Sequence, residues 1–334
     1  MEKRQLGRST VYISPIILGT WAIGGWMWGG SKDEDSIEAI QSTLTHGVNT
    51  IDTAAIYGMG YSEEIVARAI KNKRQDYIIA TKGGMRWSGS EGAEPWVQQD
   101  RDGKMVTIRK NSKPASLQKE CEDSLMRLGT DVLDLYQIHW PDSTTPIEES
   151  WQAMVQLKKQ GKVRAIGVSN YNLEQLKIAH SIYPVDSIQL PYSLIRRGIE
   201  KDILPYCQKN QITVIVYSPL ERGLLTGKVT PKRQFDHDDH RTTSPLFSLE
   251  NRERALELLD RIRPIAARHH ATISQLIINC TMYMPGITAI IAGARNASQA
   301  IENAEAGYLP LTQQERSEII EVFAQSSFQQ MIPI

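Results

Sequence analysis

Four side chains in the sequence could together carry out acid–base chemistry on a carbonyl group. Asp52, Lys82 and His139 each stand at the carboxyl end of an apolar run typical of a β-strand, and Tyr57 follows Asp52 in the next loop. A carboxylate beside a lysine keeps the ammonium charged, and an ammonium beside a phenol favours the tyrosinate and lowers a pKa that starts at about 10. Such a tyrosine can act as a general acid or base near neutral pH, and a histidine across the site can polarise a carbonyl oxygen. These residue types predict protonation of a carbonyl oxygen while another group attacks the carbon.

Strands that alternate with helices place these side chains. Eight short apolar runs predict strands at 15–18, 48–51, 77–81, 133–138, 163–168, 187–190, 213–217 and 287–292. Amphipathic patterns predict helices at 33–46, 62–71, 114–127, 147–160, 172–181, 199–210 and 297–306. This α/β alternation indicates a parallel sheet, and eight strands favour a closed (β/α)8 TIM barrel over the alternative of an open doubly wound sheet. Because barrel strands end on one rim, where active sites lie, we expect Asp52, Lys82 and His139 to converge there.

One barrel accounts for the chain as a single domain over residues 1–334, although the length is also compatible with two domains. A hairpin around Gly7-Arg8 is expected before the first strand, and an extra helix at 312–325 after the last repeat. Polar segments at about 83–113 and 220–249 lengthen the spacing after the third and seventh strands. We expect both to be long rim loops that shape a substrate pocket.

Composition and charge exclude several classes of protein. The 38 Lys and Arg residues balance 38 Asp and Glu residues, which argues against a nucleic-acid binder that relies on phosphate attraction. The three cysteines are scattered and odd in number, so neither a disulfide framework nor a zinc site is expected. Polar residues, glycine or proline interrupt the uncharged segments 9–31 and 271–294, and the N-terminus lacks the apolar region of a signal peptide. We expect a cytoplasmic protein without nucleic-acid or membrane partners.

The sequence resembles the aldo-keto reductases over almost its whole length. The fragments that carry the resemblance, in the order of that family, are Leu18-Gly19-Thr20-Trp21, Asn49-Thr50-Ile51-Asp52-Thr53-Ala54, Tyr57-Gly58, Ala80-Thr81-Lys82, Leu135-Tyr136-Gln137-Ile138-His139, Ile166-Gly167-Val168-Ser169-Asn170, Tyr217-Ser218-Pro219-Leu220 and Gly293-Ala294-Arg295-Asn296. The resemblance implies a (β/α)8 barrel that uses NADPH or NADH, with a catalytic tetrad of Asp52, Tyr57, Lys82 and His139. It also implies hydride transfer to a carbonyl carbon, with Tyr57 protonating the oxygen, Lys82 lowering the pKa of Tyr57 and His139 positioning the carbonyl.

The resemblance further implies which residues hold the cofactor, with the nicotinamide ring stacked on Tyr217. The implied cofactor-binding residues are Thr20, Trp21, Ser169, Asn170, Gln189, Tyr217, Ser218, Pro219, Leu220, Arg222, Gly223, Leu225, Lys228, Gly293, Ala294, Arg295, Gln299 and Asn303. Arg295 stands at the start of a predicted helix, where its planar guanidinium can bind a 2′-phosphate. This feature favours NADPH over NADH.

Most tryptophans follow predicted strands, where loops bury little core. Those expected to line the mouth of the substrate pocket are Trp21, Trp26, Trp28, Trp87 and Trp140. The expected substrate is a small aldehyde, ketone or open-chain sugar, because the departures from the family pattern resemble bacterial aldehyde reductases and sugar dehydrogenases. No metal site is expected at His237-Asp238-Asp239-His240, which lies in a polar loop.

Two alternatives to this enzyme are open. Lys82 could instead form a Schiff base, but that lysine must be deprotonated and Asp52 opposes deprotonation. The chain could also be a cofactor-binding regulatory subunit, because a potassium-channel β subunit resembles the same family. Turnover of a simple aldehyde separates the second alternative from a reductase. The sequence leaves the oligomeric state open and slightly favours a monomer.

Overall fold

Eight parallel strands close into a barrel in this computed structural model, which describes residues 1–25, 32–100, 102–235, 239 and 241–324. The strands are β3 (Ile16–Gly19), β4 (Thr50–Asp52), β5 (Ile78–Gly83), β9 (Leu133–Ile138), β10 (Val163–Ser169), β11 (Ser187–Pro191), β12 (Thr213–Tyr217) and β13 (Ala289–Gly293). They pair in this order, and β13 returns to pair with β3. The predicted (β/α)8 fold and all eight predicted strands are confirmed, with ends shifted by at most two residues.

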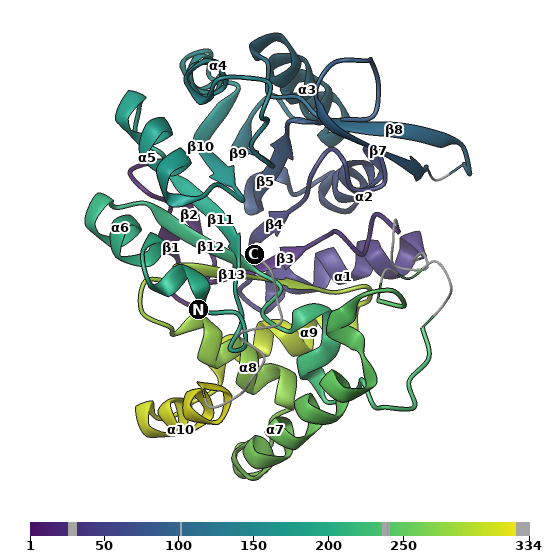
Figure 1. Cartoon of the computed structure of the whole chain (residues 1–334), viewed down its shortest axis with the longest axis vertical. Coiled ribbons are helices and arrows are strands. Elements are labelled where there is room, and N and C mark those ends of the chain that lie inside the picture. Colours follow the sequence, from purple (N-terminus) through teal and green to yellow (C-terminus); the bar gives the residue numbers. More distant parts are fainter. Residues whose placement is uncertain (26–31, 101, 236–238, 240, 325–334) are drawn as a thin grey trace.

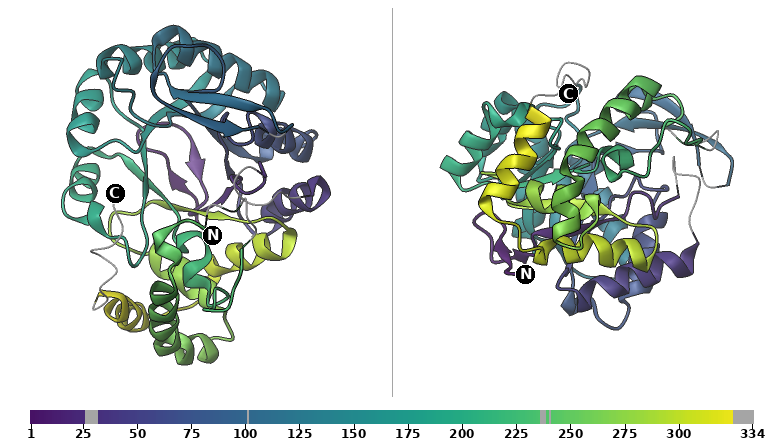
Figure 2. Two further views of the ribbon diagram at one scale, coloured as in Figure 1. Left: turned by 45° about the vertical axis from the view of Figure 1, so that its right-hand side comes forward. Right: turned by 90° about the horizontal axis from the view of Figure 1, so that it is seen from below.

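Seven predicted helices cover the outside of the barrel (Figures 1 and 2). They are α1 (Asp33–Thr45), α2 (Tyr61–Ile70), α3 (Pro114–Leu128), α4 (Ile147–Lys159), α5 (Leu173–Ile182), α6 (Ile203–Asn210) and α9 (Ala297–Glu305). Local chemistry fixes their ends: α3 begins at a proline and ends before Gly129, whose φ of 62° is left-handed. The start of α6 differs from its prediction at 199–210, because a short 3-10 turn (Gly198–Glu200) precedes the N-cap Asp202.

Two helices between β12 and β13 lie outside the predicted pattern. In α7 (Leu249–Arg268) the buried residues follow helical spacing, but Pro264, a residue unfavourable inside helices, falls within it. In α8 (Ile273–Met282) nine of ten residues are buried, so the helix has no polar face for a periodic pattern to reveal. Together with the predicted C-terminal helix α10 (Gln313–Ala324), they form a second apolar cluster at the bottom of Figure 1. No helix in the described ranges has the length and apolar composition that crossing a membrane requires.

The segment after the third barrel strand is a small sheet rather than a loop. Residues 83–113 contain β6 (Met85–Arg86), β7 (Ala93–Gln99) and β8 (Met105–Lys110), which pair antiparallel in the order β6-β8-β7. Ile108 of β8 is buried with Ala54, Ile56 and Met85, and this apolar cluster holds the sheet on the rim. The segment 220–249 contains two 3-10 helices, η3 (Glu221–Thr226) and η4 (Pro245–Phe247).

The barrel interior is apolar at one end and polar at the other. The predicted N-terminal hairpin, β1 (Arg4–Gln5) with β2 (Tyr12–Ile13), is confirmed. Its apolar residues Leu6, Val11 and Ile13 pack with barrel residues such as Leu135 and Ile215, and so close the end where the strands begin. Buried polar side chains of Asp52, Lys82 and Ser169 lie at the carboxyl ends of their strands, which is where barrel active sites form.

Candidate active site

A buried ion pair joins the second and third strands of the barrel. The Nζ atom of Lys82 in β5 lies 2.6 Å from Oδ1 of Asp52 in β4, and it also donates to the carbonyl oxygen of Thr53 at 2.9 Å. Both side chains are almost completely shielded from solvent. Burial lowers the pKa of Lys82, and the charge and hydrogen bond of Asp52 oppose that effect. The geometry predicted for Asp52 and Lys82 at one rim is therefore present.

Tyr57 and His139 lie next to this ion pair. The Nζ atom of Lys82 is 5.2 Å from the centre of the Tyr57 ring, and the ring centres of Tyr57 and His139 are 5.8 Å apart in an edge-on arrangement. All four residues of the expected tetrad thus come together, from the ends of β4, β5 and β9 and from the loop before α2.

The pKa of Tyr57 moves in the direction opposite to the sequence expectation. Burial raises the pKa of this phenol well above its ordinary value, and the charge of Asp52 raises it further. The expected lowering by Lys82 is absent because Asp52 already balances the ammonium at 2.6 Å, while burial penalises the tyrosinate. At neutral pH Tyr57 is therefore protonated and able to donate its proton.

His139 is neutral for a related reason. Burial lowers its pKa well below the usual value, and the charge of Lys82 lowers it further. Its Nδ1 atom is buried without a hydrogen-bond partner among the described residues. The side-chain amide of Asn170 donates to the backbone carbonyl of His139 at 3.0 Å and so fixes the chain at this point. A neutral imidazole beside a protonated phenol gives the site two hydrogen-bond donors for one oxygen atom.

A chain of two glutamine amides supports Asp52 from inside the barrel. The Nε2 atom of Gln189 donates to Oδ2 of Asp52 at 2.8 Å and to Oε1 of Gln137 at 3.0 Å. Gln137 in turn donates to Oγ of Ser187 at 3.2 Å. The resemblance implied Gln189 as a cofactor residue; in the structure its amide nitrogen donates to the carboxylate of Asp52 and so orients it. Gln137 was not among the predicted site residues, although it stands two positions before His139 on β9.

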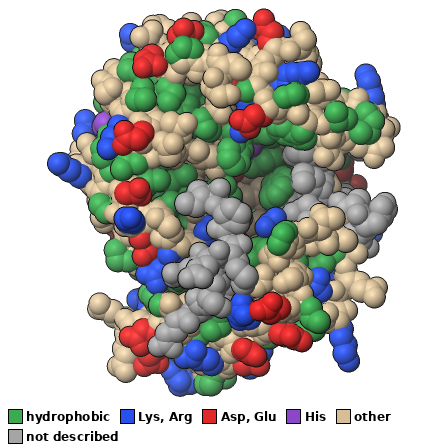
Figure 3. Space-filling model, viewed as in Figure 1, with side chains coloured by type: hydrophobic (Ala, Val, Ile, Leu, Met, Phe, Trp, Pro, Cys, Tyr) green, Lys and Arg blue, Asp and Glu red, His purple; other side chains and the backbone are tan. Residues whose placement is uncertain are grey.

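A cavity of about 630 Å³ opens above these residues at the carboxyl ends of the strands. Figure 3 shows hydrophobic side chains gathered near the middle of this face. The cavity is lined by most of the residues expected to bind cofactor or substrate: Thr20, Trp21, Asp52, Tyr57, His139, Trp140, Ser169, Asn170, Gln189, Tyr217, Ser218, Pro219, Leu220, Arg222, Gly223, Lys228, Gly293, Ala294, Arg295, Gln299 and Asn303. It is also lined by residues absent from the sequence expectation, including Ile56, Met85, Arg233, Phe235, Arg241, Ser274 and Glu302.

Two expected pocket residues lie elsewhere, and two cannot be placed. Leu225 is fully buried in the apolar cluster beneath η3, because its side chain packs with that core rather than facing the cavity. Trp87 lies against the guanidinium of Arg127, 5.9 Å from its ring centre, and does not line the cavity. Trp26 and Trp28 lie outside the described residues, as do three members of His237-Asp238-Asp239-His240. Within the described part of the chain, no group of three or more acidic, histidine or cysteine residues could hold a metal ion.

A strained turn after β12 brings cationic side chains to one wall of the cavity. Ser218, Glu221 and Arg222 all have left-handed backbone conformations, with φ between 43° and 59°. The buried Glu221 holds the turn by accepting hydrogen bonds from Ser193 at 2.6 Å and from Arg196 at 3.1 Å. Burial lowers the pKa of Arg222, and Arg196 and Arg241 are among the neighbouring charges that affect it.

Comparison with known proteins identifies the family. Residues 15–323 match the family described as the Aldo/keto reductase family. The chain belongs to this family. An aldo-keto reductase of Bacillus subtilis, YhdN, is 39% identical over 90% of this chain and 86% of its own length. The NADH-specific methylglyoxal reductase of Escherichia coli is 36% identical over 92% of this chain and 93% of its own length.

Solved structures agree with this assignment. The glycerol dehydrogenase AKR11B4 of Gluconobacter oxydans superimposes with a TM-score of 0.87 and 37% identity, covering 99% of this chain and 97% of the other. The aldo-keto reductase AKR11C1 of Bacillus halodurans, in its holo form, gives a TM-score of 0.76 and 27% identity, covering 96% of each chain. The named activities of these relatives favour an enzyme over the regulatory subunit considered from the sequence.

The cavity of this aldo-keto reductase fits the nicotinamide dinucleotide that the family uses. Near the tetrad it offers amide and hydroxyl groups, since Ser169, Asn170 and Gln189 all line it. Farther away it offers positive charge, because Arg222 and Arg295 line it without an ion-pair partner among the described residues. An amide-rich end and an unpaired cationic end match a carboxamide and phosphates, respectively.

Proposed function

We propose that this aldo-keto reductase reduces the carbonyl group of small aldehydes, ketones or open-chain sugars, with NADPH as reductant and Tyr57 as general acid. The observation that supports the proposal most directly is the pairing of a buried, protonated Tyr57 with the Asp52–Lys82 ion pair at the floor of the cavity. A proton donor, a cation behind it and a neutral His139 beside it are the groups that carbonyl reduction needs.

The side chains divide the work at the carbonyl oxygen. When bound, the reduced nicotinamide supplies a hydride to the carbonyl carbon. Tyr57 donates its proton to the oxygen, and the neutral ring of His139 donates a hydrogen bond to the same atom. The phenol then carries negative charge, which the ammonium of Lys82, 5.2 Å from the ring centre, stabilises. Lys82 thus acts mainly on the charge that develops during the reaction.

The preference for NADPH rests on Arg295. This residue lies just before α9, where the helix N-terminus and the guanidinium favour an anion such as a 2′-phosphate. Glu302 also lines the cavity, but its carboxylate accepts from Oγ1 of Thr272 at 2.8 Å and lies 3.5 Å from Nζ of Lys228. The negative charge of Glu302 is thereby partly balanced by Lys228. The Escherichia coli relative named as NADH-specific makes a direct comparison of the two cofactors necessary.

A small carbonyl substrate suits the wall of the cavity near Tyr57. Trp21, Ile56, Met85 and Trp140 form an apolar wall that leaves few polar partners besides Tyr57 and His139. The names of two relatives, a methylglyoxal reductase and a glycerol dehydrogenase, also concern molecules of three carbon atoms. We therefore propose short aldehydes and ketones as the first substrates to screen.

The test of this function is the variant Tyr57→Phe, assayed by oxidation of NADPH with short aldehydes, ketones and aldoses. We expect kcat to fall by about 10²–10⁴-fold, because the general acid is lost, with the Kd for NADPH and the melting temperature almost unchanged. Retained turnover in Tyr57→Phe would refute the role of Tyr57. Tight binding of NADPH by the wild type without turnover of any carbonyl compound would support the regulatory subunit instead.

A further inference from the structure

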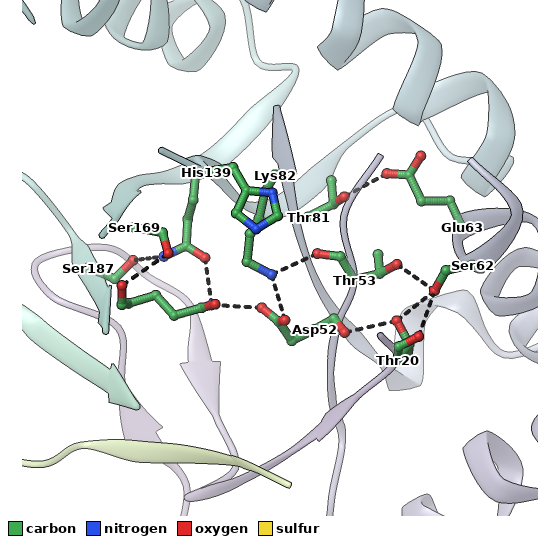
Figure 4. A network of polar contacts seen from close by, with 12 residues as sticks. Thr20, Asp52, Thr53, Ser62, Glu63, Thr81, Lys82, His139, Ser169 and Ser187 are labelled. Atoms are coloured by element: carbon green, nitrogen blue, oxygen red, sulfur yellow. Dashed lines mark hydrogen bonds and ion pairs between the residues drawn. The ribbon is translucent and has the colours of Figure 1, made fainter. Parts of the chain in front are cut away.

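Side chains in the first turn of α2 form hydrogen bonds with residues that lie in, or directly after, three neighbouring barrel strands (Figure 4). The hydroxyl of Ser62 lies 2.7 Å from Oγ1 of Thr20, directly after β3, and 3.0 Å from Oγ1 of Thr53, directly after β4. Thr20 also donates its hydroxyl to the backbone carbonyl of Asp52 at 3.0 Å. One serine therefore links the chain that follows β3 to the chain that carries Asp52.

The next residue, Glu63, reaches the third strand. Its carboxylate is completely buried and accepts from Oγ1 of Thr81 in β5 at 2.6 Å and from Nε of Arg127 in α3 at 2.7 Å. Side chains alternate across a strand, so Thr81 points toward the helices while Lys82 points into the barrel. Glu63 thus holds β5 from outside at the position next to Lys82.

The same turn also holds Tyr57. The backbone N–H of Ser62 donates to the carbonyl oxygen of Tyr57 at 3.1 Å. Tyr57 lies in the short connection between β4 and α2, so its distance from Lys82 depends on where α2 begins relative to β5. Ser62 and Glu63 are therefore hydrogen-bonded to the loop that contains Tyr57 and to residues in or next to the strands that carry Asp52 and Lys82.

We propose that Ser62 and Glu63 are positioning residues that fix Tyr57 relative to the Asp52–Lys82 ion pair. The proposal rests on the proposed role of Tyr57 as general acid. Neither side chain lines the cavity, so both act through the backbone and side chains that they hold. A displacement of about 1 Å between a proton donor and its target can lower the rate about 10²-fold. Loss of the contacts made by Ser62 and Glu63 should therefore have a measurable effect on catalysis.

Glu63 adds a charge as well as hydrogen bonds. The titratable groups that face it are Lys82 of β5, Arg127 and Cys121 of α3, and Tyr136 of β9. The negative charge of Glu63 raises the pKa of Lys82 and so opposes loss of its proton. Removal of that charge should therefore make Lys82 lose its proton at lower pH.

Three variants separate the charge from the hydrogen bonds. Glu63→Gln removes the charge and replaces the charge-assisted hydrogen bonds from Thr81 and Arg127 with weaker bonds to a neutral amide. Thr81→Val removes the strand contact and keeps the charge. Glu64→Gln is the matched control, because Glu64 is the adjacent carboxylate on the same helix and is exposed.

We expect kcat to fall about 10- to 100-fold in Glu63→Gln and Thr81→Val, with KM changed less than about threefold. In Glu63→Gln alone, the alkaline limb of the kcat profile should move to lower pH by roughly 0.5 to 1 unit. In the protein without cofactor, hydrogen exchange should accelerate at the amides of Thr53 and Ala55 in both variants, because these amides bond to the carbonyls of Ala80 and Lys82 in β5. Glu64→Gln should match the wild type in every measurement.

The outcomes distinguish this proposal from the proposed function. Unchanged kcat and unchanged exchange in both variants would refute the positioning role and leave the role of Tyr57 intact. Accelerated exchange together with full activity of Tyr57→Phe would refute the role of Tyr57 and, with it, the positioning of a proton donor. If Glu63→Gln does not fold, Thr81→Val decides the question, since valine replaces threonine with almost the same shape.

Discussion

At the scale of single residues, the chemistry depends on which charges are balanced. Asp52 balances the charge of Lys82 at 2.6 Å, so the ammonium does not lower the pKa of Tyr57. Burial raises that pKa, and Tyr57 is therefore protonated and able to donate a proton. His139 is neutral for the same reason of burial. Arg295, by contrast, makes no ion pair among the described side chains and faces the cavity. These charge states support the proposed proton donation by Tyr57, and the position of Arg295 supports the proposed binding of an anionic group.

Arg295→Ala should weaken NADPH about 10- to 100-fold and NADH less than about threefold, because the lost interactions are charge-assisted hydrogen bonds to a phosphate that only NADPH carries. Titration calorimetry with each cofactor measures both values. Arg263→Ala, which removes an exposed arginine of α7, is the control. An equal loss of affinity for the two cofactors would contradict the assignment of Arg295.

At the scale of elements, the small sheet β6-β8-β7 forms part of the cavity wall. Met85 of β6 lines the cavity, and it packs with Ile56 and with the buried Ile108 of β8. Tyr57 and Trp140 contact the same apolar cluster. The packing of the small sheet therefore affects the shape of the cavity next to Tyr57, the proposed general acid.

Ile108→Ala should destabilise the protein by about 3 kcal/mol through the space left in this cluster, and should raise KM for the carbonyl substrate severalfold with little change in cofactor affinity. Steady-state kinetics and urea unfolding measure the two effects. Val97→Ala on β7 is the control, since Val97 is 60% exposed and contributes little to packing. Equal KM values for Ile108→Ala and wild type would show that the small sheet does not affect substrate binding.

At the scale of the whole molecule, the two ends of the barrel serve different purposes. The carboxyl ends of the strands carry the tetrad, and the opposite end carries a buried charge cluster. There Asp134, 1% exposed, accepts from Arg74 at 2.8 Å, from Arg164 at 3.0 Å and from the backbone N–H of Ile79 at 2.9 Å. This cluster joins β5, β9 and β10 far from the cavity, so we assign it to stability rather than catalysis.

Asp134→Ala should cost about 3 kcal/mol, because it removes the ion pairs with Arg74 and Arg164 and leaves the buried backbone amide of Ile79 without its acceptor. The kcat of the folded variant should stay within about twofold of the wild type. Urea unfolding and kinetics at saturating substrate measure the two quantities. Asp260→Ala removes one partner of an exposed ion pair with Arg263 and should leave the unfolding midpoint unchanged. A large fall in kcat with unchanged stability would contradict the division between the two ends.

The sequence by itself determined the barrel and the convergence of Asp52, Lys82 and His139 on one rim. Strand and helix patterns are local, and a parallel barrel brings every strand end to one rim, so Asp52, Lys82 and His139 could be placed together from their positions alone. The same logic failed for α8, where burial on all sides removes the periodic pattern, and for β7 and β8, which belong to a sheet outside the barrel repeat.

Only the tertiary structure decided the charge states and the supporting contacts. The raised pKa of Tyr57 depends on the depth of burial and on how closely Asp52 approaches Lys82, and neither distance is written in the order of residues. The bond from Gln189 to Asp52 spans 137 positions of the chain, and Glu63 meets Thr81 from another element. Electrostatic and hydrogen-bond energies depend on separations of a few ångströms in space, which folding sets after local patterns have chosen the elements.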